Sequence, residues 1–223
     1  MQTSLSTSLL NDWSDWLPRL LDGLVVSLQV TGLSLLFGFA AGLVFALLSS
    51  SASPVVRWPS LLLVEIGRGM PSLVMLQIVY FGLPGVGVTL EAFPASVLAL
   101  SLTTASYTSE IIRAGLRAVP AGECEAADAL GMSRADAIRF IIVPQGLRIA
   151  LPTLMGFAIL VLQISALAFS LGLPELLSQA YSIGASTFRY FDVLVLAGLL
   201  YLAITIPASW LVGRFEGRLA TNR

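Results

Sequence analysis

Long stretches without a charged residue constrain this chain of 223 residues more than any other feature. The charge-free windows of at least 18 residues are 23–56, 69–90, 92–109, 149–174 and 193–213. A helix that crosses a bilayer needs about 20 mainly apolar residues. Apolar residues make up 57% of the chain and charged residues 11%, whereas soluble domains carry about 25% charged residues. We therefore expect an integral membrane protein.

Turn-forming residues trim these windows. The Ser-rich run before Pro54 ends the first span, Pro59 suits the first turn of the second, and Pro84 with Gly85 closes it. We expect an all-α fold with a periplasmic N-terminal segment at 1–20, one transmembrane domain at 21–215 and a cytoplasmic tail at 216–223. The expected spans lie near 23–48, 59–82, 92–117, 149–172 and 191–213.

Arginine placement predicts the orientation. The basic residues are all Arg, and nine of them fall in alternate loops or at the C-terminus, whereas the opposite side holds only Arg19 and Arg189. Cytoplasmic loops carry the excess of basic residues. We therefore expect the N-terminus outside and the C-terminus in the cytoplasm.

The residue types exclude several kinds of chemistry. The chain has no His and one cysteine, Cys124, so it offers no imidazole base, internal disulfide or zinc site. Without Lys it cannot form a Gly-x-x-x-x-Gly-Lys phosphate loop, and it has no basic run for nucleic acid. We expect no catalytic residue, metal site or cofactor in this chain, and any ATP hydrolysis on another chain.

The long hydrophilic loop at 118–146 predicts a helical hairpin. Residues 121–130 favour a short helix, Gly131 suits the left-handed position after it, and Ser133 with Asp136 fits a cap for a second helix that Pro144 ends. On physical grounds alone, a simple connector and a docking element are equally supported.

Residues in this loop resemble the EAA loop of bacterial ABC importer permeases. The matching residues are Glu125, Ala126, Ala127, Gly131, Ile141 and Pro144. The segments Tyr107–Gly115, Pro144–Arg148 and Arg68–Pro71 also resemble permeases for polar amino acids, of the histidine, glutamine and glutamate type. The resemblance implies a type I ABC importer fold in the bacterial inner membrane. It also implies that Glu125, Ala126, Ala127, Gly131 and Ser133 belong to a coupling helix that docks on an ATPase.

The resemblance implies several partners and a cargo. The partners are an ATP-binding subunit dimer that holds ATP and Mg, a second permease subunit (a copy or a paralogue), a periplasmic binding protein and membrane lipid, with no nucleic acid. The cargo is a polar amino acid, and Gln163 resembles the glutamate/aspartate-type branch. Gly156 and residues 163–166 depart from the family pattern, so the resemblance implies the architecture rather than one particular substrate.

A helix break is expected in the second span at Gly67, Gly69 and Pro71, because Pro71 cannot donate to the carbonyl of Gly67. Broken helices at membrane depth often line binding sites, and an intramembrane Arg is a functional hypothesis. The residues expected to line a polar path are Arg68, Ser72, Ser106, Tyr107, Gln163 and Ser165. Two alternatives are a structural Glu65–Arg68 pair and hydroxyls that serve only helix packing.

Competing functions remain at this point. A stand-alone secondary carrier or channel for a small polar solute would explain Arg68 and Pro71 but not the hairpin. A membrane enzyme would need a nucleophile, acid pair or metal cluster that the chain lacks. The segment 174–189, with Glu175, is either a short helix over the outer mouth or a surface loop.

Overall fold

The computed structural model describes residues 2–221, with side chains for residues 12–217. This part of the chain is helical and contains no β-strand, which confirms the all-α expectation. The chain forms two compact units. Unit 1 comprises Met1–Ser34, Pro71–Leu100 and Ile159–Leu211, and unit 2 comprises Leu35–Met70, Ser101–Ala158 and Val212–Arg223.

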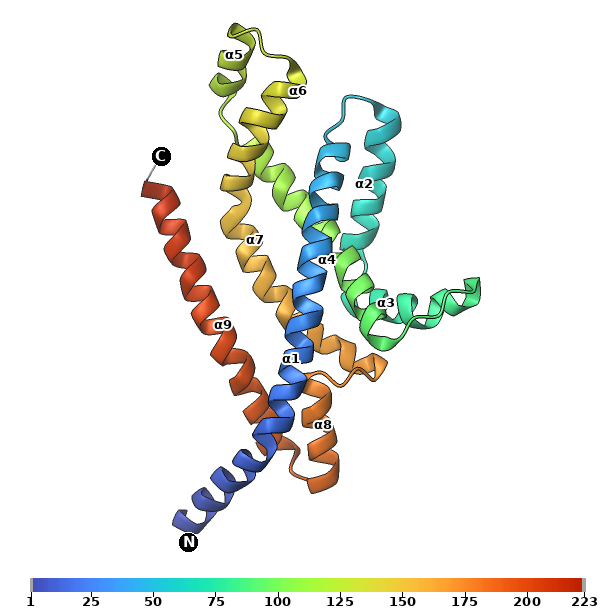
Figure 1. Cartoon of the computed structure of the whole chain (residues 1–223), viewed down its shortest axis with the longest axis vertical. Helices are drawn as coiled ribbons and strands as arrows, with labels where there is room; N and C mark the ends of the chain where they lie inside the picture. Colours follow the sequence, from blue (N-terminus) through green and yellow to red (C-terminus); the bar gives the residue numbers. More distant parts are fainter. Residues whose placement is uncertain (1, 222–223) are drawn as a thin grey trace. The chain divides into compact units, whose positions relative to one another are not determined.

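The first and last helices are longer than the apolar windows alone predict (Figure 1). Helix α1 (Gln2–Ser49) continues through the expected N-terminal segment at 1–20. Helix α9 (Tyr190–Thr221) continues into the expected tail at 216–223, of which 222–223 lie outside the described residues. Both extensions are more polar than the spans they continue, so the apolar windows did not include them.

The expected second span at 59–82 is not one continuous helix. Helix α2 (Pro54–Gly69) starts at Pro54, five residues before the expected Pro59, and ends at Gly69. Met70 and Pro71 are extended, with ψ of 127° and 136°, before α3 (Ser72–Gln77) begins. A π-helical turn, η1 (Ile78–Gly82), and a 3-10 turn, η2 (Leu83–Val86), follow. Pro54 serves as the helix start because a first-turn residue needs no N–H donor.

Helices α4 (Ala92–Arg117) and α7 (Val143–Ser165) flank the hairpin, and a 3-10 segment, η4 (Ala166–Leu171), extends α7. The hairpin consists of α5 (Ala121–Ala129), α6 (Arg134–Ala137) and a π-helical turn, η3 (Ile138–Ile142). Pro144 does not end the second hairpin helix, contrary to expectation, because the helix continues from α6 through the π-helical turn η3 into α7. The Val143 amide donates to the Ile138 carbonyl, so the hydrogen-bond register already shifts in the turn directly before the proline.

Among the residues that the structure describes, three helical stretches are long and apolar enough to cross a membrane, or four if the bent pair α2–α3 counts as one. The sequence predicted five. The difference is α4, which has 26 residues but carries seven Ser and Thr side chains between 96 and 109. Those hydroxyls lower its mean hydropathy below that of the other stretches.

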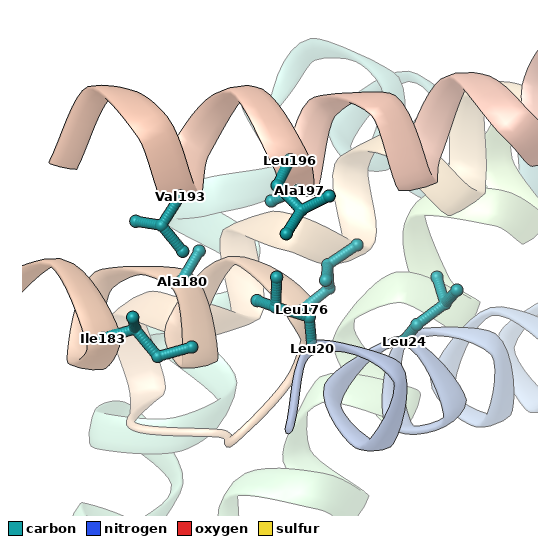
Figure 2. Close-up of a cluster of buried hydrophobic side chains, with 8 residues drawn as sticks. All are labelled: Leu20, Leu24, Leu176, Ala180, Ile183, Val193, Leu196 and Ala197. Atoms are coloured by element: carbon teal, nitrogen blue, oxygen red, sulfur yellow. The ribbon is translucent and has the colours of Figure 1, made fainter. Parts of the chain in front are cut away.

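Unit 1 has a core where α1, α8 (Leu176–Thr187) and α9 meet. Figure 2 shows the side chains of these three helices pointing toward one another. The buried residues are Leu20, Leu24, Leu176, Ala180, Ile183, Val193, Leu196 and Ala197. Trp13 and Trp16 pack against this cluster, so residues at the N-terminal side of the first apolar window belong to a packed core rather than to a free segment.

Unit 2 relies on close contact between small residues. Its buried cluster contains Ala46, Ile112, Ala150 and Leu154 from α1, α4 and α7. A side chain at Gly42 would overlap Thr108, and one at Gly115 would overlap the carbonyl oxygen of Gly146. Small residues that let helix backbones approach closely are typical of membrane helix packing.

Candidate functional site

The C-terminal end of α2 lies directly against α4 in unit 2. A Cβ at Gly67 would overlap the Ser106 hydroxyl, whereas one at Gly69 would meet no atom within 4 Å. Ser106 is buried, and its hydroxyl donates to the carbonyl oxygen of Leu102 at 3.0 Å. Gly67 therefore sets how closely the two helices approach at this point.

Four charged side chains form a row beside this contact. Arg68 Nη1 lies 3.2 Å from Glu65 Oε1 and 4.0 Å from Glu110 Oε2. The same Glu110 oxygen is paired with Arg113, one turn further along α4. Within the described residues, Arg68 Nε, Glu110 Oε1 and Arg113 Nε are buried and have no hydrogen-bond partner. The row is charge-balanced, yet its hydrogen bonding is incomplete.

Tyr107 connects the helix break to α7. Its hydroxyl donates to the backbone carbonyl of Arg68 at 3.2 Å. Its ring stacks on Phe157, with the ring centroids 5.4 Å apart. Because the Arg68 carbonyl lies in the last turn of α2, this bond occupies one of the acceptors that a helix end leaves free.

An open cleft of about 380 Å³ lies between α4 and α7 in unit 2. Its lining residues are Glu110, Ile111, Ala114, Gly115, Ile149, Ala150 and Thr153. Glu110 is the charged residue of the lining, and Thr153 is the hydroxyl-bearing one. The cleft is otherwise apolar, so it suits a small molecule with a polar group attached to an aliphatic part.

The residues expected along the polar path are divided between the two units. Arg68, Ser106 and Tyr107 meet in unit 2, as described above. Ser72, Gln163 and Ser165 belong to unit 1. Ser165 is buried and donates to the carbonyl of Leu162 at 2.7 Å, whereas Gln163 is exposed and Ser72 half-buried.

Sequence reasoning missed Glu110 and Thr153. Glu110 was visible as the charged residue that ends an apolar window, and Arg113 follows at the i,i+3 spacing of helical ion pairs. Its proximity to Arg68 was not visible, because the two residues are 42 positions apart. Thr153 carries no signal in the sequence that separates it from other hydroxyls in apolar helices.

The hairpin has defined caps at its central turn. Gly131 has φ of 72°, and the amides of Gly131 and Met132 donate to the carbonyls of Asp128 and Ala127, which completes a Schellman motif. Ser133 accepts from the Asp136 amide at 3.2 Å, as the capping prediction requires. These bonds confirm the expected turn and define how α5 leads into α6.

The residues expected to contact an ATPase lie on this hairpin. Ala127 is buried, whereas Glu125 and Ala126 on the same helix are exposed. Glu125 pairs with no other side chain in the described part of the chain. Glu123 nearby accepts from Gln145 at 3.0 Å, a contact that ties α5 to the start of α7. The exposed carboxylate of Glu125 is thus free to meet another protein.

Unit 1 holds a fully buried carboxylate, Glu175, at the start of α8. Its Oε1 accepts from the Ser178 amide at 2.7 Å, and its Oε2 accepts from the Leu177 amide at 3.0 Å. The hydroxyls of Ser27 and Tyr201 also donate to Oε2, at 3.2 and 3.3 Å. Glu175 therefore caps α8 and joins it to α1 and α9, so 174–189 is a packed helical element rather than a surface loop.

Comparison with known proteins identifies the family that shares this architecture. The family model described as "Binding-protein-dependent transport system inner membrane component" matches residues 35–221. The arginine transport system permease protein ArtQ of Bacillus subtilis is 34% identical over 207 residues, which cover 92% of this chain and 94% of ArtQ. The probable glutamine ABC transporter permease protein GlnP of the same organism is 34% identical over 88% of this chain and 92% of its own length.

Solved structures agree with this placement. A chain from the crystal structure of an amino acid ABC transporter with histidines superposes with a TM-score of 0.87 at 36% identity. That match covers 93% of this chain and 97% of the other. The MetNI methionine ABC transporter shares the fold, with a TM-score of 0.72 at 22% identity. From the family match and the relatives together, the chain belongs to the inner membrane components of binding-protein-dependent transport systems, as a multi-pass permease subunit of the ABC importer type.

Proposed function

We propose that this chain forms the membrane path of an ATP-driven importer for a polar amino acid. The observation that carries the proposal is the capped hairpin with its exposed, unpaired Glu125. A stand-alone carrier or channel has no use for such an element. The named cargoes of its relatives, arginine and glutamine, support an amino acid as the substrate.

The proposed assembly contains this permease and three further components. Two ATP-binding subunits hold ATP and Mg and receive the coupling helix through Glu125, Ala126, Ala127, Gly131 and Ser133. A second permease subunit, either a copy or a paralogue, completes the path, and a periplasmic binding protein delivers the cargo. The excess of Arg on the hairpin side supports a cytoplasmic hairpin and C-terminus and an external N-terminus.

Within the membrane, Arg68 is the proposed contact for the carboxylate of the cargo. A guanidinium binds carboxylates through two parallel hydrogen bonds, and the helix break at Gly67, Gly69 and Pro71 leaves local backbone irregular beside it. Ser72, Ser106, Tyr107, Gln163 and Ser165 are proposed to line the remaining path, with Gln163 favouring a glutamate- or aspartate-like cargo.

A reconstituted complex tests the proposal. The chain is co-purified with the ATPase and binding protein encoded beside it, placed in proteoliposomes and assayed for uptake of radiolabelled amino acids. We expect uptake into the vesicles to require ATP enclosed in them, because the hairpin of the transporting complexes then faces the vesicle interior. Glu125→Arg should abolish transport-coupled ATP hydrolysis, whereas the matched reversal Glu216→Arg, on an exposed acid outside the hairpin, should preserve it. Uptake by this chain without an ATPase would instead establish the stand-alone carrier.

A further inference from the structure

Helix α9 carries an exposed apolar stripe that the proposed path does not use. Its residues recur every three or four positions, so they lie on one face of the helix. They are between 38% and 80% exposed, and all belong to unit 1: Phe191, Val195, Leu199, Leu202, Ile206 and Trp210. A different face of α9 carries Val193, Leu196 and Ala197, which point into the core of unit 1 (Figure 2). Unit 1 therefore leaves an apolar surface on α9 exposed.

The length of the stripe matches the hydrocarbon layer of a bilayer. Phe191 and Trp210 are 19 positions apart, which corresponds to about 28 Å at the rise of an α-helix. The hydrocarbon core of a typical bilayer is about 30 Å thick. Aromatic residues stand at both ends, with Tyr190 beside Phe191 and Trp210 opposite, and such residues gather where a bilayer meets water. The stripe thus has the length and the ends of a lipid-facing surface.

Charged residues lie just beyond the same two ends. Arg189 and Asp192 form an ion pair beside Phe191, with 2.8 Å between Nε and Oδ2. At the other end, the first charged residue after Trp210 is Arg214. Charged groups are costly inside hydrocarbon. They limit the apolar layer along α9 to the stretch that the stripe occupies.

The size of the side chains favours lipid over a second permease subunit as the cover of the stripe. Contacts between membrane helices are enriched in small residues that let the backbones approach closely. Gly42 and Gly115 show this inside unit 2, where an added side chain would overlap the neighbouring helix. None of the six stripe residues is Gly, Ala, Ser or Thr. Large aliphatic and aromatic side chains suit flexible acyl chains, which adapt to an uneven surface.

We infer that phospholipid acyl chains cover this stripe and that the hydrocarbon layer extends along α9 from Phe191 to Trp210. This face of α9 then neither lines the polar path nor contacts the second permease subunit. The Arg189–Asp192 pair lies at one surface of the membrane. The inference depends on the membrane family of the chain and on the geometry of unit 1, and not on the identity of the cargo.

Spin labels at single cysteines measure this position in the membrane directly. In the cysteine-free Cys124→Ser permease, a nitroxide is attached to Phe191→Cys, Leu199→Cys, Leu202→Cys or Trp210→Cys. The permease–ATPase complex is placed in vesicles of phosphatidylcholine and phosphatidylglycerol. Oxygen, which concentrates in hydrocarbon, and nickel ethylenediaminediacetate, which stays in water, each change the signal by collision with the label. The signal of the Cys124→Ser complex, treated in the same way, is subtracted.

We expect the ratio of oxygen to nickel collisions to peak at Leu199 and Leu202, midway along the stripe, and to fall toward both ends. The matched control is Phe188→Cys, because Phe188 is 88% exposed but lies in the turn before α9. The peak ratio should exceed that of the control by about tenfold or more, because a polar chelate enters hydrocarbon only at a high free-energy cost.

Three results would overturn the inference. Rare collision with both reagents at Leu199 and Leu202 would show that protein covers the stripe, and oxidative cross-linking of Leu199→Cys between two copies would identify that protein as a second permease. Frequent collision with nickel at these positions would place the stripe in water. A peak displaced by a helical turn or more would refute the stated boundaries. Two central positions guard against one substitution that prevents assembly, and no readout requires transport, so the result is independent of the proposed function.

Discussion

Glu175 in unit 1 and Glu110 in unit 2 both lie among packed helices, yet they differ in how many of their carboxylate oxygens have hydrogen-bond partners. Both oxygens of Glu175 accept hydrogen bonds, from two backbone amides and two hydroxyls on three helices. Glu110 is held on one oxygen by arginine, and its other oxygen has no partner in the described chain. A fully hydrogen-bonded carboxylate stabilises the fold, whereas Glu110 leaves one buried oxygen without a partner among the described residues.

The two units also differ in charge. Unit 1 contains six acidic residues and two arginines, a formal charge of −4, and unit 2 contains seven acidic residues and ten arginines, a formal charge of +3. The total of −1 hides this separation. Because basic residues gather on the cytoplasmic side of membrane proteins, the contrast agrees with the proposed orientation, in which the hairpin of unit 2 lies in the cytoplasm.

The largest expected effect tests the structural role of Glu175. Glu175→Ala removes a helix cap and leaves several donors unsatisfied, a cost of about 3 kcal/mol. The thermal midpoint of the purified protein should fall by about 10 °C. Glu91→Ala, which removes an exposed acid from the same unit, is the control. A midpoint no lower than that of the control would show that the four hydrogen bonds carry no net stability.

The next effect concerns the close packing of unit 2. Gly67→Ala forces a methyl group into Ser106 and should cost about 2 kcal/mol, whereas Gly69→Ala has free space and should cost far less. Combining Gly67→Ala with Ser106→Ala should restore part of the loss, because the two residues share one contact. Equal thermal midpoints for the two glycine variants would contradict the close approach of α2 and α4.

A smaller effect is expected at Tyr107. Tyr107→Phe loses the hydrogen bond to the Arg68 carbonyl but keeps the ring that stacks on Phe157. One such bond contributes about 1 kcal/mol, so the midpoint should fall by about 3 °C. Tyr107→Leu, which loses the stacking as well, should fall further. If the two variants melt together, the ring contact contributes nothing measurable.

The smallest effect is a pH dependence. Burial raises the pKa of Glu175 more than its hydrogen bonds from Leu177, Ser178, Ser27 and Tyr201 lower it. Because the folded protein then binds this proton more tightly than the unfolded chain, the stabilisation is complete below the ordinary glutamate pKa and is lost as pH rises through the raised value. Thermal midpoints measured between about pH 4 and pH 8 should decline with pH in the wild type and less in Glu175→Gln. Identical slopes of the thermal midpoint against pH in the two proteins would show that Glu175 does not cause the pH dependence.

Much of the fold followed from local sequence. The turn at Gly131 and the cap at Ser133 were predictable because each depends on residues within a few positions. The break near Pro71 follows from a missing N–H in the same turn. The expected helix end at Pro144 was wrong because a π-helical turn directly before the proline lets the helix continue, and the sequence does not reveal that turn.

The candidate site was harder to predict from the sequence than the fold. Arg68 was found because a charge in an apolar stretch is conspicuous. Its neighbours were not, because the contacts of Arg68 with Glu110 and Tyr107 join positions far apart in the chain. Ser106 is buried against Gly67, and no local pattern in the sequence distinguishes a hydroxyl that packs between helices from one that binds a ligand.

The sequence by itself determined that this chain is a membrane protein, where several of its turns lie, on which loops its arginines gather and which family it resembles. These properties depend on hydropathy, charge and short motifs. Only the tertiary structure decided which polar groups have partners. It alone separated Glu175, whose oxygens are all in use, from Glu110, which retains an unused oxygen beside a cleft. The physical reason is that hydrogen-bond satisfaction is a property of atoms brought together by folding, and partners distant in the chain leave no periodic or local trace.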